Sequence, residues 1–312
     1  PRSMALTLLE AQKLNPGTVL ENAIVRMFAE ESDIVRALPF ESITGNALKY
    51  NREGALPGVG FRGINEAYTE STGVLNPVTE SLAILGGDID VDKFLVDTMG
   101  AQQRDVQRRM KVAAMAQAWA RTLIKGDTTS QPREFDGLQV RLGGAQLIAN
   151  SAAAGGGALS LARLDEAIDA VDNPTHLIMA KAMRRRFTAL MRNQALAGNV
   201  LLDKDEFGRP MLSYGGLPIL VGYSRNGGVE PIPFVEVGAG GGAAQNTSIY
   251  VVSFGPGRLT GIRNGGMQVR DLGELQSAPV LRDRVETYAG IALMHGRAAA
   301  RLSSVNDAAI TA

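Results

Sequence analysis

One long segment constrains the fold of this 312-residue chain more than any other. Residues 96–127 read VDTMGAQQRDVQRRMKVAAMAQAWARTLIKGD, and nearly every position favours a helix. Such a helix would be about 28 residues and about 42 Å long. Apolar side chains form a broad face in its later half, whereas charged and amide side chains surround Val106 and Met110 in its earlier half. We expect the later half to pack on its own domain and the earlier half to project past that core.

Charge and composition exclude several classes of protein. Lys and Arg together number 32, as do Asp and Glu, so the net charge is zero, which argues against a dedicated nucleic-acid-binding protein. The absence of Cys excludes disulfides, thiol nucleophiles and Cys-ligated zinc. The first residues lack the apolar core of a secretory signal, and no apolar run is long enough to cross a membrane.

The sequence contains no recognisable catalytic or metal-binding constellation. His176 and His295 are its only histidines, and their context favours structural roles over a metal site. No nucleophile elbow or phosphate-binding loop occurs. The stretch DIDVDK, residues 88–93, resembles a calcium loop, but Lys93 stands where such a loop needs Gly, so we interpret its carboxylates as turn and capping groups. These observations predict a protein that is no enzyme and holds no cofactor or metal.

Residues 38–77 have a different character from the rest of the chain. Two polar, β-prone stretches, ALKYNR and EAYTESTG, flank EGALPGVGFRGIN, which is rich in Gly. The pattern predicts a long hairpin with a wide tip. An isolated hairpin is marginally stable, and this one has too few apolar residues for a core of its own. Something outside the hairpin is therefore expected to hold it.

The remaining segments favour an α+β fold. A strand near 78–85 is expected to turn at a Gly-Gly pair towards the long helix, and residues 174–194 are predicted to form one helix. The chain is mainly β from residue 199 onward, without the regular alternation of a doubly wound sheet. The cluster Arg184, Arg185 and Arg186 could contact phosphate or nucleic acid, although such a cluster on an amphipathic helix is more often a solvated face.

This succession resembles the major capsid protein of tailed bacteriophages, which has the Hong Kong 97-type fold. The stretch TGNALKYNREGALPGVGFRGINEAYTESTGVLNPVTESLAILGGDIDVDKF is similar to the extended loop of that family and the strand after it. RDVQRRMKVAAMAQAWARTLIKGD is similar to its spine helix. LSLARLDEAIDAV, NPTHLIMAKAMRRRFTALMR and GRPMLSYGGLPILVG resemble its axial domain, and VETYAGIALMHGRAAARLSSV resembles its closing strands.

The resemblance implies an α+β fold with an N-terminal arm, an extended β-hairpin loop, a long spine helix, and peripheral and axial domains. The implied boundaries are 1–37 for the arm, 38–77 for the loop, 78–134 with 250–295 for the peripheral domain, 135–249 with 296–306 for the axial domain, and 307–312 for a tail.

The function that this resemblance implies is self-assembly into an icosahedral shell enclosing double-stranded DNA. The expected partners are further copies of the chain as pentamers and hexamers, portal, scaffolding and possible decoration proteins, and packaged DNA bound without sequence specificity. No membrane partner is expected. The expected location is the virion, after synthesis in the cytoplasm of the bacterial host.

In such families the extended loop lies across the neighbouring subunit near its spine helix. This implies a set of intersubunit contacts in the loop and on the earlier half of the helix: Lys49, Arg52, Glu53, Pro57, Phe61, Arg62, Glu66, Tyr68, Glu70, Arg104, Arg108 and Arg109. Some members cross-link a loop Lys to a neighbour. Lys49 is the only loop Lys and precedes the tip, so no cross-link is predicted.

Three alternatives stay open at this stage. An encapsulin, a cellular compartment of the same fold, would bind a cargo peptide near the N-terminal arm. An α+β enzyme or ligand-binding protein would need a pocket that holds His176 or His295 with carboxylates. A tail or decoration component would form tubes or trimers instead of shells.

Overall fold

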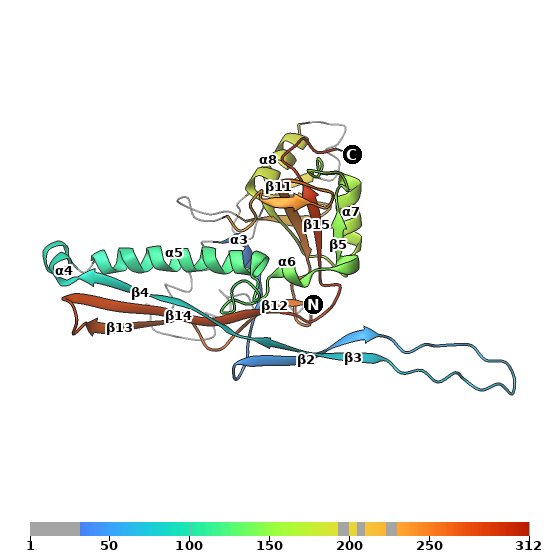
Figure 1. Ribbon diagram of the computed structural model, residues 1–312, viewed down its shortest axis with the longest axis horizontal. Helices are drawn as coiled ribbons and strands as arrows, with labels where there is room; N and C mark the ends of the chain where they lie inside the picture. The colour runs from blue at the N-terminus through green and yellow to red at the C-terminus, as the bar shows by residue number, and fades with distance from the viewer. Residues whose placement is uncertain (1–31, 101, 193–199, 205–209, 223–229, 312) are drawn as a thin grey trace.

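The computed structural model describes residues 32–100, 102–192, 200–204, 210–222 and 230–311 of an elongated subunit (Figure 1). Most of the predicted N-terminal arm lies outside these residues. A long helix lies along one sheet and ends beside a second sheet, and a hairpin of β2 (Ala47–Ala55) and β3 (Val74–Ser81) projects from the body. The hairpin tip and helix α4 (Lys93–Met99) lie at opposite ends of the molecule.

The first sheet is organised around the long strand β14. Antiparallel β4 pairs along one edge of β14, antiparallel β13 and β12 pair along the other, and β1 adds in parallel to β12. Burial alternates along β14, so that Asp283 and Val285 are buried while Arg282 and Arg284 are partly exposed. The strands are β1 (Phe40–Ser42), β4 (Ala83–Asp92), β12 (Leu259–Arg263), β13 (Gln268–Glu274) and β14 (Val280–Leu293).

The second sheet mixes parallel and antiparallel pairs in the order β5-β15-β11-β6-β9-β8-β7, with β10 added to β11. Its strands are β5 (Leu147–Ala149), β6 (His176–Ala180), β7 (Val200–Lys204), β8 (Pro210–Tyr214), β9 (Leu217–Gly222), β10 (Glu236–Gly238), β11 (Gly241–Val252) and β15 (Ala299–Val305). Helices α7 (Leu161–Asp169) and α8 (Lys181–Leu190) pack on this sheet. Two mixed sheets without a regular strand–helix alternation agree with the predicted α+β class.

The long helix is shorter than predicted because Gly100 interrupts it. Gly100 has φ 89°, in the region that favours Gly, and helix α5 begins after it and spans the 24 residues Gln102–Lys125. The other helical segments are α3 (Asp33–Ala37), α6 (Leu138–Arg141) and the 3-10 turn Gly144–Gln146.

The later half of α5 buries the apolar face that the sequence predicts. The indole of Trp119 lies at the centre, with ring centroids 5.5 Å from Phe40 and 6.0 Å from Phe135. The buried residues of α5 are Val112, Met115, Ala116, Trp119, Ala120, Leu123 and Ile124. They belong to one hydrophobic cluster that continues through α3 into both sheets, so the two sheets share a core.

Two local predictions are wrong for identifiable reasons. Gly86 and Gly87 form no turn and lie inside β4. A Cβ atom at Gly86 would lie 2.5 Å from the carbonyl oxygen of Val285, so this glycine permits a close approach of two strands. The helix predicted over 174–194, of which 193 and 194 lie outside the described residues, begins only at Lys181, because the preceding apolar run forms β6 between β11 and β9.

The buried His176 predicts acid sensitivity of the fold. Burial lowers the pKa of this imidazole from 6.5 to about 4, so the unfolded chain binds the proton more readily between these values. The free energy of unfolding should therefore fall by up to about 3 kcal/mol as the pH drops from 6.5 to 4. His176→Gln should lack this component in denaturant unfolding measured across that range. His295→Gln, at a more exposed histidine, should retain it.

Candidate intersubunit surfaces

The base of the hairpin is fixed to the body by buried polar contacts. The Tyr50 hydroxyl donates to the Leu293 carbonyl at 2.9 Å, and the Arg52 guanidinium contacts the same oxygen. Across the hairpin, the largely buried Glu80 accepts from Arg141 Nη2 at 2.8 Å. Burial, and then the Glu80 carboxylate, raise the pKa of Tyr50, so the phenol stays a neutral donor. These contacts orient the hairpin away from the body.

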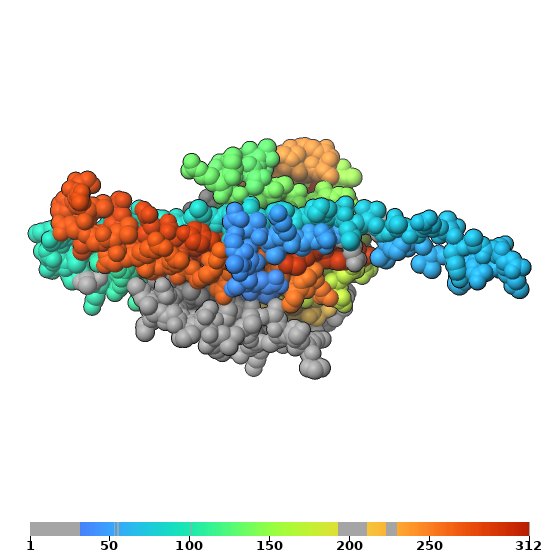
Figure 2. Space-filling model, turned by 90° about the horizontal axis from the view of Figure 1, so that it is seen from below, coloured from blue at the N-terminus to red at the C-terminus, as the bar shows by residue number. Residues whose placement is uncertain are grey.

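The hairpin tip, residues 56–73, has internal contacts but little cover. Ser71 Oγ donates to the Gly58 carbonyl at 2.8 Å, and the Arg62 guanidinium lies 5.2 Å from the centre of the Tyr68 ring. The side chains of Val59, Phe61 and Ile64 are 94% exposed or more. In the space-filling view the tip extends beyond the rest of the described chain (Figure 2). Several bulky apolar side chains therefore face solvent in the single subunit.

The earlier half of α5 is held by charges on its own subunit, which the sequence analysis did not predict. The carboxylate of Asp283, on β14, has no exposed area and accepts from both Arg104 and Arg108. The two shortest contacts are 2.5 Å from Arg104 Nη2 and 2.8 Å from Arg108 Nη2. This half of the helix therefore lies on its own β4–β14 ribbon and does not project past it.

Two further carboxylates balance the pair of arginines around Asp283. Asp271 lies 2.9 Å from Arg104, and Asp105 lies 3.1 Å from Arg108. The hydrogen bonds from Arg108 to Asp283 raise the pKa of Arg108. The Gly273 amide, and then Arg104, lower the pKa of Asp271. The outer side of the helix stays open, since Val106 is 48% and Met110 is 60% exposed and Arg109 is exposed as well.

The DIDVDK stretch forms a charge ladder, and only part of it caps a helix as predicted. Asp92 accepts from the Phe94 amide at 2.8 Å at the start of α4. Asp88 and Asp90 instead pair across the ribbon with Arg284 at 2.7 Å and Arg282 at 2.6 Å. The regular β pairing opposite β14 places each carboxylate directly across from its partner.

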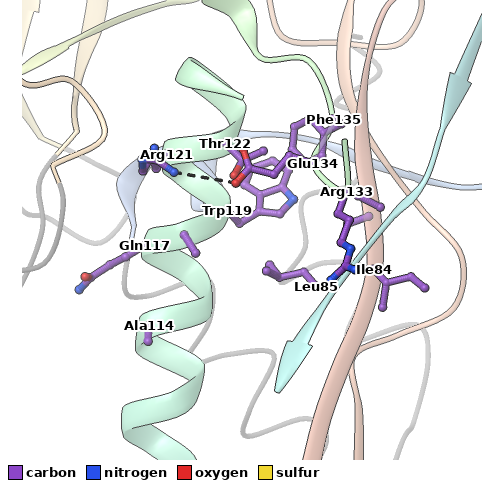
Figure 3. A pocket seen from close by; sticks show the side chains of 13 residues that line it. Ile84, Leu85, Ala114, Gln117, Trp119, Arg121, Thr122, Arg133, Glu134 and Phe135 are labelled. Carbon is purple, nitrogen blue, oxygen red and sulfur yellow. Dashed lines mark ion pairs between the residues drawn. The ribbon is translucent and has the colours of Figure 1, made fainter. Parts of the chain in front are cut away.

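A hollow of about 410 Å³ lies beside the later half of α5 (Figure 3). It is bounded by α5, by Ile84 of β4 and by the loop that carries Glu134, which lies 3.9 Å from Arg121. The indole nitrogen of Trp119 is buried and has no hydrogen-bond partner within the described residues. Ile84 is 73% exposed, and Ala114 and Ala118 of α5 are exposed too. The hollow thus offers partly apolar walls that are open to solvent in the single subunit.

The structure distributes the predicted contact residues over two regions. The predicted contact residues of the loop lie along the hairpin. Arg52 anchors its base, and seven others are exposed: Lys49, Pro57, Phe61, Arg62, Glu66, Tyr68 and Glu70. Glu53 belongs to β2, and its side chain is not described. Arg104 and Arg108 form ion pairs with Asp283 in the β4–β14 ribbon of their own subunit, and Arg109 is exposed to solvent. Their predicted contacts with a neighbour remain a prediction.

Sequence reasoning missed the groups that hold these surfaces in place. Asp283, Glu80 and Arg141 lie in unremarkable polar stretches, and each partner is remote in sequence. A periodicity analysis therefore gives no signal for them. The one sign in the sequence of β14 is that Asp283 alternates with Leu281 and Val285 on the same face of the strand.

Neither histidine lies in a candidate active site. His176 packs against Phe254, with ring centroids 5.1 Å apart, inside the second sheet. His295 lies in the turn after β14, where the sequence had suggested a strand, and its Nδ1 is 3.8 Å from Asp172. Within the described ranges, no three His, Cys, Asp or Glu side chains are grouped as a metal site would require. None of the described helices has the length and apolar character of a membrane span.

An elongated subunit with a projecting hairpin, a long helix on a β ribbon and a second mixed sheet has the Hong Kong 97-type capsid fold. The model of a family described as major capsid protein GP7 matches residues 17–162, somewhat less than half of the chain. The fold agrees with the predicted Hong Kong 97-type architecture, and the first part of the chain is similar to the major capsid protein GP7 family. A comparison with curated protein sequences gives no match.

Solved structures support the same fold at low sequence identity. The encapsulin SrpI from Synechococcus elongatus PCC 7942 is 18% identical, with a TM-score of 0.64 and 99% of each chain covered. A chain from Mycobacterium phage Bobi is 15% identical, with a TM-score of 0.62, 89% of this chain and 91% of that chain covered. The capsid of a native GTA particle gives 17% identity, a TM-score of 0.61 and coverage of 85% and 87%.

The buried carboxylate of Asp283 predicts a strong dependence of stability on this one group. Asp283→Ala should lower the free energy of unfolding by about 3–5 kcal/mol, because two partly buried guanidinium groups lose their shared acceptor. Urea unfolding of the unassembled subunit measures the change. Asp97→Ala, at an exposed carboxylate of α4, should change it by less than about 0.5 kcal/mol. A loss below about 1 kcal/mol at Asp283 would mean that the ion cluster does not hold the helix.

Proposed function

We propose that this chain is a major capsid protein that assembles into an icosahedral shell around double-stranded DNA. The observation that carries the proposal is the hairpin tip, whose apolar side chains are almost fully exposed in the single subunit. Burying one such side chain contributes about 1.5–3 kcal/mol, so a surface that covers the tip would gain substantial stability. A further copy of the chain is the partner that the fold and the family match favour.

The tip of one subunit is proposed to cover the hollow beside α5 of the next. The hairpin points away from the hollow of its own subunit, since its base is fixed to Leu293 and Arg141. The hollow offers partly apolar walls, in which the exposed side chain of Ile84 would contact the apolar side chains of the incoming tip. Such head-to-tail contacts are heterologous and close into rings, which fits pentamers and hexamers.

The proposed division of labour follows the two sheets in outline, although the end of β11 at 250–252 belongs to the second sheet and β1 of the first sheet lies within the loop range. The peripheral domain comprises 78–134 with 250–295 and the axial domain 135–249 with 296–306, with the extended loop before them and a short tail after them. Axial domains would meet around the symmetry axes. Portal, scaffolding and decoration proteins would complete the particle, whose subunits would be made in the bacterial cytoplasm and function in the virion. The role is structural, with neither catalysis nor a cofactor.

An encapsulin-type compartment is the second candidate. The match to the SrpI encapsulin extends over 99% of both chains, more than the phage matches cover. Both candidates require the same self-assembly and differ in content. Nuclease-protected DNA inside purified particles would favour the capsid, whereas a co-purifying enzyme would favour the compartment.

Engineered cysteines test the proposed contact directly, because the chain contains no Cys of its own. Phe61→Cys combined with Ala118→Cys should give a ladder of covalent oligomers after mild oxidation of assembled particles. Phe61→Cys combined with Arg163→Cys, at an exposed position on α7, should not. Ladders of equal intensity from both pairs, or from neither, would contradict docking of the tip beside α5.

Removing the apolar character of the tip should block assembly without affecting the subunit. Phe61→Asp with Ile64→Asp should leave the melting temperature of the unassembled subunit unchanged, since both side chains are 94% exposed or more. The yield of shells in sedimentation should fall at least about tenfold, the equivalent of about 1.4 kcal/mol. Thr69→Asp with Thr72→Asp adds the same charge to the same exposed loop and should assemble. Normal assembly of the Phe61 and Ile64 variant would mean that the tip is no clamp.

A further inference from the structure

Helix α8 carries a row of basic side chains without partners. Lys181, Arg184, Arg185 and Arg192 are exposed, and none of them forms an ion pair with a described residue. Lys181, Arg184 and Arg185 lie at intervals of three and one residues in α8, which places them towards one side of the helix, and Arg192 lies just past its C-terminal end. We call these four residues the α8 basic face. Their neighbour Arg186 differs, because it pairs with Asp307 at 2.8 Å.

Many cations elsewhere in the described chain pair with carboxylates, whereas the α8 basic face groups four that do not. Arg284, Arg141 and Arg301 are each matched with a carboxylate of their own subunit. Although the net charge of the whole chain is zero, the α8 basic face carries a local excess of positive charge. Four cations at close range, without a carboxylate partner among the described residues, repel one another, which disfavours the free surface unless an anion is nearby.

We propose that the α8 basic face binds the phosphate backbone of nucleic acid without sequence specificity. The ten residues of α8 are about 15 Å long and Arg192 follows directly, so the four cations extend over a length comparable to the roughly 12 Å width of a DNA major groove and could reach phosphates on both of its sides. Lys and Arg contacts to phosphate position a protein on DNA but carry no sequence information. This inference rests on the proposed shell function and locates its contact with the packaged DNA.

A membrane surface is a poorer fit for the same helix. An interfacial helix needs bulky apolar side chains beside its cations, to enter the lipid boundary. The bulky apolar residues of α8 are Met183, Phe187 and Leu190, and all three are buried against the sheet. The exposed residues between the cations are Thr188 and Ala189, whose side chains are too small to act as apolar anchors in lipid. The α8 basic face is therefore better suited to bind phosphate groups in water than to enter a lipid boundary.

Titration of a short fluorescent DNA duplex with unassembled subunits at several salt concentrations tests the proposal. Replacing Lys181, Arg184 and Arg185 by Gln should weaken binding at least about tenfold near 0.1 M salt and reduce the slope of log K against log salt by about 2–3. A matched control replaces Lys49, Arg109 and Arg133 by Gln, which removes the same charge elsewhere and should change the affinity less than about twofold. Arg184→Lys with Arg185→Lys keeps the charge and should keep the affinity.

Three results would overturn the assignment. These are an unchanged affinity of the triple variant, an equal loss in the matched control, and a loss of binding to phosphatidylserine vesicles in place of DNA. The result of this titration can be distinguished from a test of the proposed shell function. Shells that form from a triple variant with normal DNA affinity would reject the α8 basic face alone. A parent chain that forms no shells would reject the shell function, while the duplex titration would still report on α8.

Discussion

The buried face of α5 is the interaction on which the rest of this subunit depends. Trp119 contacts Phe40 of the first sheet and Phe135 of the following loop, and the same helix ends at Lys125, 3.5 Å from Glu236 of the second sheet. Arg301 completes this junction at 2.9 Å from Glu236. Because both sheets share one hydrophobic cluster through this helix, neither has a separate core that would let it move freely.

Two projections leave this common core, and different forces hold them. The β4–β14 ribbon keeps α5 beside it through the buried carboxylate of Asp283, where charge and hydrogen bonds replace apolar contacts. The hairpin is held only at its base, through Tyr50, Arg52 and Glu80. Its exposed tip has little cover from the described part of its own chain, and this is why we propose the hairpin as the element that joins one copy to the next.

Sequence patterns predicted the features that arise from periodicity and missed those that arise from remote contacts. The apolar face around Trp119 and the polar, Gly-rich hairpin were both readable, because spacing and composition alone define them. Gly86 was misinterpreted as a turn because only the approach of β14 explains it, and β6 was taken for helix because a short apolar run fits both elements. Arg104 was expected to face a neighbour because its partner, Asp283, lies 179 residues away in the chain.

The central claim is that a single copy leaves apolar surface that only further copies cover. Negative-stain electron microscopy of the purified protein, at concentrations where it stays in solution, tests this claim most directly. The account predicts closed shells of uniform diameter in which no density projects freely from a subunit. Solitary subunits at every concentration, with the hairpin folded back on the body of its own chain, would contradict it.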